Sequence, residues 1–293
     1  MTSIAELEAV AADGWRAPEQ AALGDWRLRA AEGFTGRANS ALAVGDPGLP
    51  LPEAVAEVGR WYAARVLPGM VAIAFPVGDP QASELDNLLA ERGWMVSHGA
   101  IVMTGAPGVV VARTTDPDTP VDLDPEPDPG WLGLYRFLDE RPPPISRRLL
   151  LSVPWQSFAS ARAAGQTLAI GRVAAARGWA GLTAVEVDRR HRRRGLGRAV
   201  TGALSGAAAA RGVSGLYLQV RSDNDAARTL YAQAGFTEHH EYHYRVAPPG
   251  SGRFPTGTLT HSCARCPGTS GRPPRRRNGS PRRAARPGCR RSA

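Results

Sequence analysis

Apolar residues along the first hundred positions alternate between helical and strand spacing. They recur every three or four residues over 1–22, 52–65 and 83–92, which predicts three helices. Short alternating or β-branched runs between these segments predict strands at 26–30, 70–77 and 94–103. The pattern therefore predicts a helix followed by a small α/β unit of order β-α-β-α-β.

The second half of the chain holds a denser set of strands. Two short helical segments at 131–139 and 146–151 precede strand-like runs at 156–162, 167–174 and 179–187, which only short Gly-containing turns separate. Such spacing is typical of an antiparallel meander. Helix and strand patterns then alternate at 196–211, 216–220, 224–234 and 236–246. The expected architecture is α/β, a mixed and mainly antiparallel sheet flanked by helices.

Proline and acidic residues separate the two patterns. Residues 106–130 include Asp116-Pro-Asp-Thr-Pro and Asp124-Pro-Glu-Pro-Asp-Pro-Gly, which hold too many prolines for a helix interior or a central strand. The chain is therefore predicted to have four parts. These are an α/β domain at 1–105, a linker at 106–130, a second domain at 131–246 and a disordered Arg- and Pro-rich tail at 247–293.

The positive charge of the chain is concentrated in the tail. The formal net charge is +9, yet residues 250–293 hold 11 arginines and no acidic residue. Subtracting these 11 from the 36 basic residues leaves 25 basic and 27 acidic groups in residues 1–249. A nucleic-acid-binding surface spread over the fold is therefore disfavoured, and any such role would belong to the tail.

Cysteine usage and hydropathy argue against several further classes of protein. Cys263, Cys266 and Cys289 all lie in the tail, so we expect neither a disulfide framework nor a cysteine nucleophile in the folded part. One cysteine pair beside His261, with no second pair, does not predict a metal site. No apolar run of about 18 residues could span a membrane, and the N-terminus lacks a secretory signal, so a cytoplasmic location is expected.

The clearest chemistry lies in the stretch Leu182–Val200. It begins as an apolar run, passes through an arginine-rich turn with Gly195 and Gly197, and continues as an alanine-rich helix-forming segment. Strand, glycine turn and helix in this order form an anion site, because the first N–H groups of a helix are unpaired and carry partial positive charge. The expected ligand is a pyrophosphate.

Two motifs of the second half resemble the GNAT superfamily of N-acetyltransferases. The coenzyme A loop of that family has the form Gln/Arg-x-x-Gly-x-Gly/Ala, which Arg192-Arg-Arg-Gly-Leu-Gly197 matches. The second family signature is matched by Leu218–Phe236, which includes Asn224, Tyr231 and Gly235. The resemblance covers roughly residues 120–246 and implies a GNAT fold, acetyl-CoA as the co-substrate and no metal.

The resemblance also implies roles for individual residues. Tyr231 stands where the family's general acid protonates the leaving thiolate, and Asn224 stands where a residue bonds the pantetheine or places the helix. Main-chain groups around Val185 and Val187 would pair with the pantetheine and polarise the thioester carbonyl. The expected cofactor-binding residues are Val185, Val187, Arg192, Arg193, Arg194, Gly195, Leu196, Gly197, Arg198 and Asn224.

The general base is not identified by any pattern. Glu186 is a candidate on the key strand, although it alternates with Val185 and Val187 and so points to the other side of the sheet from them. His239, His240 and His243 on the last strand are further candidates. A chain of water molecules is an equal alternative.

The first half resembles a degenerate copy of the same fold, as in a two-part subgroup of the family. Leu88–Trp94 matches Leu230–Phe236 in spacing, but Leu89 stands in the tyrosine position and no Arg-x-x-Gly-x-Gly precedes it. We therefore expect a non-catalytic domain that covers the catalytic one and lines the acceptor cleft. Arg37, Asn39 and Ser40 are candidate acceptor contacts.

The end of the second half departs from the family. GNAT domains finish with two strands, and only the run at 236–246 is evident. Either this run folds back on itself or the first half supplies the missing strand.

These observations predict an enzyme that transfers acetyl from acetyl-CoA to a primary amine of a small molecule or peptide by direct attack. One alternative is a catalytically silent acetyl-CoA sensor of the same fold. Another is a nucleic-acid-binding protein that acts through the arginine tail. Neither the acceptor nor the oligomeric state can be predicted from these patterns.

Overall fold

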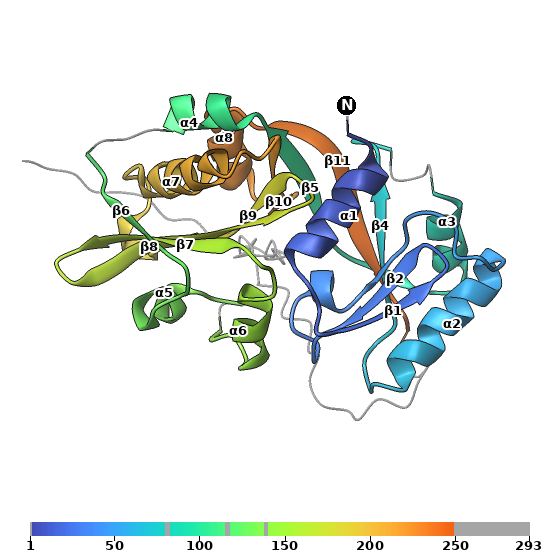
Figure 1. The fold of residues 1–293 in the computed structure, drawn as a ribbon. Helices are drawn as coiled ribbons and strands as arrows, with labels where there is room; N and C mark the ends of the chain where they lie inside the picture. Colours follow the sequence, from blue (N-terminus) through green and yellow to red (C-terminus); the bar gives the residue numbers. More distant parts are fainter. Residues whose placement is uncertain (1, 80–82, 115–117, 138–139, 249–293) are drawn as a thin grey trace, which may run out of the picture. The chain divides into compact units, whose positions relative to one another are not determined.

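A continuous sheet runs through the described part of the computed structural model, which comprises residues 2–79, 83–114, 118–137 and 140–248 (Figure 1). Its 11 strands lie in the order β1-β2-β3-β4-β11-β5-β10-β9-β8-β7-β6. The strands are β1 (Glu19–Leu23), β2 (Trp26–Ala30), β3 (Ala41–Leu42), β4 (Met70–Phe75), β5 (Met95–Gly105), β6 (Val121–Asp124), β7 (Gln156–Ala163), β8 (Gln166–Ala176), β9 (Trp179–Val187), β10 (Gly215–Arg221) and β11 (Thr237–Val246).

Helices cover both faces of this sheet. In the C-terminal half, residues 106–248, α7 and α8 pack on one face, and α5 and α6 pack on the other (Figure 1). In the N-terminal half, residues 2–105, α2 and α3 cover one face and α1 covers the other. The helices are α1 (Ile4–Gly14), α2 (Leu51–Ala63), α3 (Glu84–Glu91), α4 (Pro107–Thr114), α5 (Pro129–Leu134), α6 (Ile145–Leu150), α7 (Leu196–Ala210) and α8 (Asp225–Ala234), with short 3-10 helices η1 (Gly36–Ala38) and η3 (Arg189–His191).

The two halves exchange their last strands. β5, which ends the N-terminal half, pairs antiparallel with β10 of the C-terminal half, from Leu216 opposite Gly105 to Arg221 opposite Ala100. β11, which ends the C-terminal half, pairs antiparallel with β4 of the N-terminal half. β5 and β11 also pair with each other at the centre of the sheet. Each half is therefore completed by a strand of the other, which answers the question of the missing strand.

The exchange gives the sheet an internal repeat. Read from the two edges inward, β2-β3-β4-β11 corresponds to β8-β9-β10-β5, and both β3–β4 and β9–β10 are parallel pairs. The helix ends correspond as well, because Trp94 N–H donates to the Leu89 carbonyl and Phe236 N–H donates to the Tyr231 carbonyl. The matched spacing of the two segments therefore reflects a structural repeat, with Leu89 in the place of Tyr231.

A buried ion-pair cluster fastens β11 to the N-terminal half. The Asp86 carboxylate on α3 accepts hydrogen bonds from His243 Nε2 at 2.7 Å and from Arg245 Nε and Nη2 at 2.8 and 2.7 Å. Burial raises the pKa of Asp86, but the hydrogen bonds from Arg245 and His243 outweigh it and hold the pKa below its ordinary value.

Three element predictions need correction. The helix expected over 1–22 ends at Gly14, and β1 occupies Glu19–Leu23. The predicted linker 106–130 contains α4 and β6. Two of its prolines, Pro107 and Pro129, stand at the first turns of α4 and α5, where no amide hydrogen is needed. The helix expected over 131–139 ends at Leu134.

Other expectations concern parts that are not described. Asp116 and the tail from residue 249 onward, with its cysteines and arginine clusters, lie outside the described residues. Among the described helices, none is long and apolar enough to cross a membrane.

Candidate active site

The parallel pair β9–β10 separates before either strand ends. Its last paired residues are Leu182 and Leu218, whereas β9 continues to Val187 and β10 to Arg221. On the other edge of β9, the register shifts between Arg172 opposite Thr183 and Ile170 opposite Glu186, and Ala184 has φ 54°. This β-bulge bends β9 away from β10. Beyond Leu182, main-chain groups of β9 therefore have no pairing partner on β10. We call this separation of the two strands the gap.

The bulge also decides which face each side chain of β9 occupies. Leu182, Val185 and Val187 pack with the α7 and α8 core, whereas Ala184 packs with the core under α5 and α6. Strict alternation from Leu182 would have placed Glu186 on the α7 side, and the extra residue moves it to the α5 side. Glu186 thus lies on the face opposite to Val185 and Val187, as the sequence predicted.

The arginine–glycine loop leads from β9 into α7. Gly195 has φ 80° and precedes the first turn of α7, which has no side-chain cap, in contrast to α1, α3, α5 and α8. The first N–H groups of α7, those of Leu196, Gly197 and Arg198, have no acceptor within the helix. Arg192, Arg193 and Arg194 are exposed beside them. These residues fit a diphosphate: free donors, a positive helix end and surrounding cations.

Two arginines of the loop also have structural contacts. Arg192 Nε donates to the Val187 carbonyl at 3.3 Å, and Arg198 donates from Nε and Nη2 to the Arg113 carbonyl at 3.0 and 2.5 Å. The second contact ties α7 to the end of α4. The Arg198 side chain is thereby turned toward α4, so its expected contribution to an anion site is its main-chain N–H.

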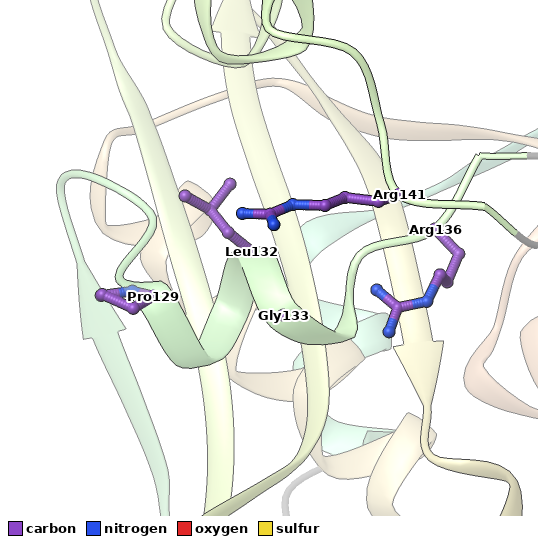
Figure 2. A pocket seen from close by; sticks show the side chains of 5 residues that line it. All are labelled: Pro129, Leu132, Gly133, Arg136 and Arg141. Carbon is purple, nitrogen blue, oxygen red and sulfur yellow. The ribbon is translucent and has the colours of Figure 1, made fainter.

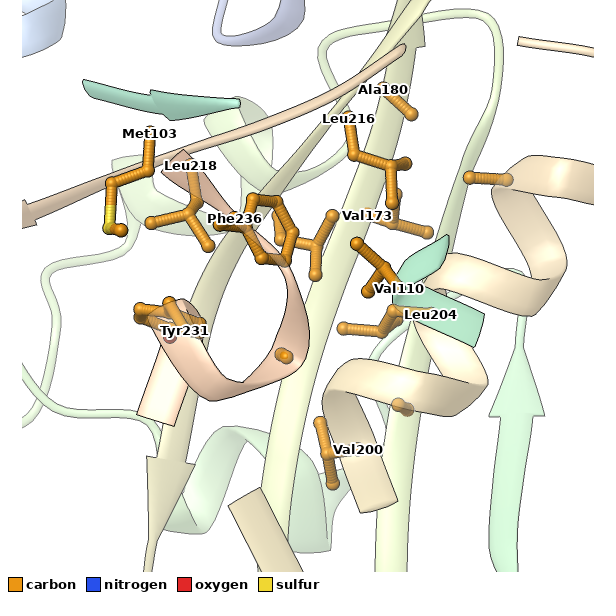
Figure 3. Close-up of a cluster of buried hydrophobic side chains, with 14 of the residues drawn as sticks. Met103, Val110, Val173, Ala180, Val200, Leu204, Leu216, Leu218, Tyr231 and Phe236 are labelled. Atoms are coloured by element: carbon orange, nitrogen blue, oxygen red, sulfur yellow. The ribbon is translucent and has the colours of Figure 1, made fainter. Parts of the chain in front are cut away.

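Tyr231 packs on the α7 side of the sheet. Its ring meets Phe236 edge-on with centroids 5.9 Å apart, and Figure 3 shows it on α8 near Leu218. Burial raises the pKa of the Tyr231 phenol, and the negative charge of Glu186 raises it further. Within the described residues its hydroxyl has no hydrogen-bond partner, yet it is not among the fully buried unsatisfied oxygens. The hydroxyl oxygen is therefore not completely buried.

Asn224 caps α8. Its Oδ1 accepts the Ala227 N–H at 3.1 Å, so its structural contact is placing the helix that carries Tyr231. This contact uses the carbonyl of the side-chain amide. The NH₂ group has no partner within the described chain.

On the α5 side of the gap, residues of both halves meet. Arg37 of η1 donates from Nη1 to Gln219 Oε1 at 3.0 Å, and its guanidinium lies 5.3 Å from the centroid of the Trp15 ring. Burial raises the pKa of Tyr135, the positive charges of Arg37 and Arg172 lower it, and the negative charge of Glu186 raises it. Tyr135 and Gln219 were not predicted as site residues. The alternation of Gln219 and Arg221 with apolar residues of β10 was the available signal for one of them.

Two suggested acceptor contacts are wrong. Asn39 Oδ1 accepts from the N–H groups of Ala31 and Gly33, and its Nδ2 donates to two carbonyls of the same turn. Ser40 is fully buried and accepts from Arg29 at both its carbonyl and its hydroxyl. Their polar atoms are used by the fold, and only Arg37 of the three reaches the gap.

The three histidines of β11 contact the N-terminal half. His240 Nε2 lies 2.9 Å from Glu8 Oε1, and His239 Nε2 lies 2.9 Å from the Thr2 carbonyl. His243 bonds Asp86. Within the described residues no hydrogen bond joins them to Tyr231, so the structure offers no support for a histidine base.

One cavity in the described part of the chain is separate from these residues. It measures about 600 Å³ and is lined by Pro129, Leu132, Gly133, Arg136 and Arg141 of α5 and the following loop (Figure 2). None of the predicted site residues lines it. Within the described ranges, no cluster of three or more metal-ligating side chains is present.

Comparison with known proteins places this site in a family. The family described as "Probable histone acetyltransferase Rv0428c C-terminal" matches residues 1–245. The chain belongs to this family of GNAT acetyltransferases. YobR of Bacillus subtilis, named an uncharacterized N-acetyltransferase, is 29% identical over 251 residues, which make up 84% of this chain and 99% of that protein.

Solved GNAT structures share the fold. A GCN5-related N-acetyltransferase from Kribbella flavida aligns with a TM-score of 0.64 at 17% identity, over 85% of this chain and 97% of that one. A tandem GNAT protein from the clavulanic acid biosynthesis pathway aligns with a TM-score of 0.61 at 13% identity, over 83% and 88%. The second likeness agrees with the internal repeat of this GNAT chain.

Proposed function

We propose that this protein transfers the acetyl group of acetyl-CoA to a primary amine by direct attack. The observation that carries the proposal is one arrangement: an uncapped, arginine-flanked start of α7 stands beside the gap between β9 and β10, and Tyr231 packs on the same side. The names of the family and of YobR, both acetyltransferases, support the same reaction class.

The donor would bind along the α7 side of the gap. The diphosphate would accept from the N–H groups of Leu196, Gly197 and Arg198, with Arg193 and Arg194 as surrounding cations. The pantetheine arm would pair with the free edge of β9 at Val185 and Val187. Binding there requires the Arg192 Nε to release the Val187 carbonyl, a contact of 3.3 Å.

The residues of the gap supply the chemistry of transfer. Main-chain N–H of β9 would stabilise the oxyanion as the amine nitrogen bonds to the acetyl carbon. The carbon–sulfur bond then breaks, and Tyr231 donates its proton to the leaving sulfur. Because burial raises the pKa of Tyr231, the phenol stays protonated at working pH. Glu186, on the opposite face, or a water held there would take the proton of the amine.

The N-terminal half would not hold a second donor. Its helix α2, the counterpart of α7, begins after Pro50 and carries Pro52 in its first turn, and Asp46 precedes it. Proline has no N–H to offer, and a carboxylate repels a diphosphate. We therefore expect one acetyl-CoA per chain.

Calorimetric titration with coenzyme A tests donor binding. The wild type should bind one equivalent, and Gly195→Asp should not, because it puts a carboxylate at the anion site at φ 80°. Gly212→Asp is the matched control, since Gly212 lies at the other end of α7 with φ 72° and open space around it. Wild type that gives no heat and no thermal protection contradicts the proposal.

Thiol release from acetyl-CoA over a panel of amines tests the transfer step. Turnover of at least one amine, lost in Gly195→Asp and kept in Gly212→Asp, supports the enzyme. Binding of coenzyme A without turnover of any amine would instead support the silent sensor.

A further inference from the structure

Arg37 is a half-buried cation without an anionic partner. Its Nη1 donates to the neutral Gln219 side chain, and no carboxylate of the described residues pairs with it. The other half-buried arginines of the N-terminal half differ, because Arg27 pairs with Asp13, and Arg65 pairs with Glu19. Arg29 and Arg172 are more deeply buried and also lack a carboxylate, but carbonyl and hydroxyl oxygens of the chain accept from them. Arg37 Nε and Nη2 have no such acceptor among the described residues, which points to an anion that the protein does not itself supply.

The position of Arg37 links it to the reaction. Gln219, its partner, is the first residue of β10 beyond the last paired position, Leu218. Gln219 shares a face of β10 with Tyr217, whereas Leu218 faces α7 and α8. Arg37 therefore lies where the gap between β9 and β10 opens, on the face opposite to Tyr231. Since the donor would occupy the Tyr231 side, this is the side from which an acceptor reaches the thioester.

Other charged groups lie around Arg37. Burial lowers the pKa of His98, and the positive charges of Arg221 and Arg37 lower it further, while Asp223 opposes them. The charge of Arg221 is balanced by Asp223, at 2.9 and 2.6 Å. Glu8 lines the same small pocket as Arg37 and Gln219, but its carboxylate lies 2.9 Å from His240 Nε2. Arg37 is therefore the charge of this cluster without a charged partner among the described residues.

The free part of the guanidinium has a definite shape. Nη1 is held by Gln219, and Trp15 packs against the group, so Nε and Nη2 are the donors left without a partner among the described residues. These two N–H groups are parallel and match the two oxygens of a planar carboxylate.

We propose that the acceptor is a small amine that also carries a carboxylate, and that the Nε–Nη2 edge of Arg37 binds this carboxylate. The inference rests on the proposed acetyl transfer and specifies its substrate. Arg37 is then the specificity residue that the non-catalytic half contributes to the site. A lysine side chain within a basic peptide would lack this interaction.

The test compares matched amines. The panel holds α-, β- and γ-amino acids with their primary carboxamides, O-phosphoethanolamine with ethanolamine, and a lysine-containing peptide. Thiol release gives kcat/KM for each amine in the wild type, Arg37→Gln, Arg37→Lys and Gln219→Glu. The control is Arg60→Gln, an exposed arginine of α2 that pairs with Glu57. Carboxamides also change the amine pKa, so each acid-to-amide ratio is compared between variants.

We expect Arg37→Gln to lower kcat/KM for the acids by about ten- to a hundredfold, the range of a hydrogen bond to a charged group. The carboxamides should stay within about threefold, as should every amine with Arg60→Gln. Gln219→Glu should act like Arg37→Gln, because it supplies Arg37 with an internal carboxylate. Arg37→Lys should recover part of the loss.

Equal losses for acids and carboxamides in Arg37→Gln would overturn the inference, as would a wild-type preference for the lysine peptide. A preference for O-phosphoethanolamine over every amino acid would overturn the carboxylate in favour of a phosphate. If no amine is turned over, the proposed function fails separately. The anion site is then judged by calorimetry of the same acids with coenzyme A-loaded protein, where equal binding to wild type and Arg37→Gln overturns it.

Discussion

Replacing Tyr231 with phenylalanine separates the catalytic role of this residue from its packing. The ring buries against the α7 and α8 core and meets Phe236, and phenylalanine keeps those contacts. The hydroxyl has no hydrogen-bond partner within the described residues, so its removal leaves no protein group unsatisfied. We therefore expect the free energy of unfolding to change by less than about 0.5 kcal/mol.

The rate of transfer should respond differently. A positioned general acid contributes about 10²–10⁴ to a rate, so kcat should fall by that factor while coenzyme A binding is unchanged. The pH profile adds a second test. Burial and Glu186 raise the pKa of Tyr231, which means that the phenol loses its proton only above its ordinary pKa of about 10. In the wild type, kcat should therefore show no alkaline decline below about pH 10 on account of Tyr231.

Steady-state thiol release, calorimetry with coenzyme A and urea unfolding measure these quantities. Tyr62→Phe is a matched control, because the fully buried Tyr62 hydroxyl donates to the Arg29 carbonyl at 2.9 Å and accepts its N–H at 3.3 Å. This control should lose about 1–3 kcal/mol of stability and keep its kcat. A Tyr231→Phe enzyme with unchanged kcat would refute the reasoning. So would a Tyr231→Phe enzyme that loses as much unfolding free energy as Tyr62→Phe.

Three further outcomes follow from the packing and charge of the chain. Gly181→Ala would place a Cβ 2.3 Å from the Tyr217 ring and hydroxyl, so urea unfolding should show a loss of about 1–3 kcal/mol, whereas Gly206→Ala in open space should show none. Asp86→Asn should cost about 3–5 kcal/mol at neutral pH because His243 and Arg245 lose their carboxylate. Because the folded-state pKa of Asp86 is lowered, the wild type should lose this stability as the pH falls below about 4. The Asp86→Asn variant should lack that part of the acid-induced loss. Wild-type and variant curves of unfolding free energy against pH that run parallel would contradict this prediction. Deleting residues 250–293, which carry 11 arginines, should abolish any salt-sensitive retention on DNA and leave amine acetylation intact, and retention by the shortened chain would show a basic surface elsewhere.

Local pattern predicted most elements of the C-terminal half. β7, β8 and β9 stand within a few residues of their predicted ranges, and so do α7, β10 and α8. Glycine marks their ends: Gly235 has φ 99°, a conformation that stops α8 as its sequence indicated. These predictions succeeded because each depends on residues that are neighbours along the chain.

Strand pairing could not be predicted in the same way. Thr104 of β5 lies opposite both Tyr217 of β10 and Thr237 of β11, and nothing in the three segments encodes this partnership. β5 and β11 would bury the same apolar faces whether each paired within its own half or with the other half. Hydropathy alone therefore does not decide between these two pairings. The sequence posed the question of a missing strand, and only the three-dimensional arrangement answered it.

The predicted site was incomplete for a related reason. The arginine–glycine loop and Tyr231 stand out within contiguous motifs, whereas Tyr135 follows α5 in a segment without a motif. Gln219 lies inside the second motif, but nothing in that motif singles it out. Asn39 and Ser40 were misjudged because a polar side chain in a turn serves the backbone as often as a ligand. The side of β9 on which Glu186 lies depends on a bulge that the sequence does not announce.

The exchange of β5 and β11 constrains how the protein can be made. During synthesis the N-terminal half emerges first, but its sheet lacks β11 until residue 246 has been added. Until then the edge of β4 exposes unpaired backbone groups, the kind of surface on which nascent chains aggregate. The sheet of the N-terminal half can therefore be completed only after β11 has been synthesised, and a premature stop before β11 would leave both β4 and β5 without this partner strand.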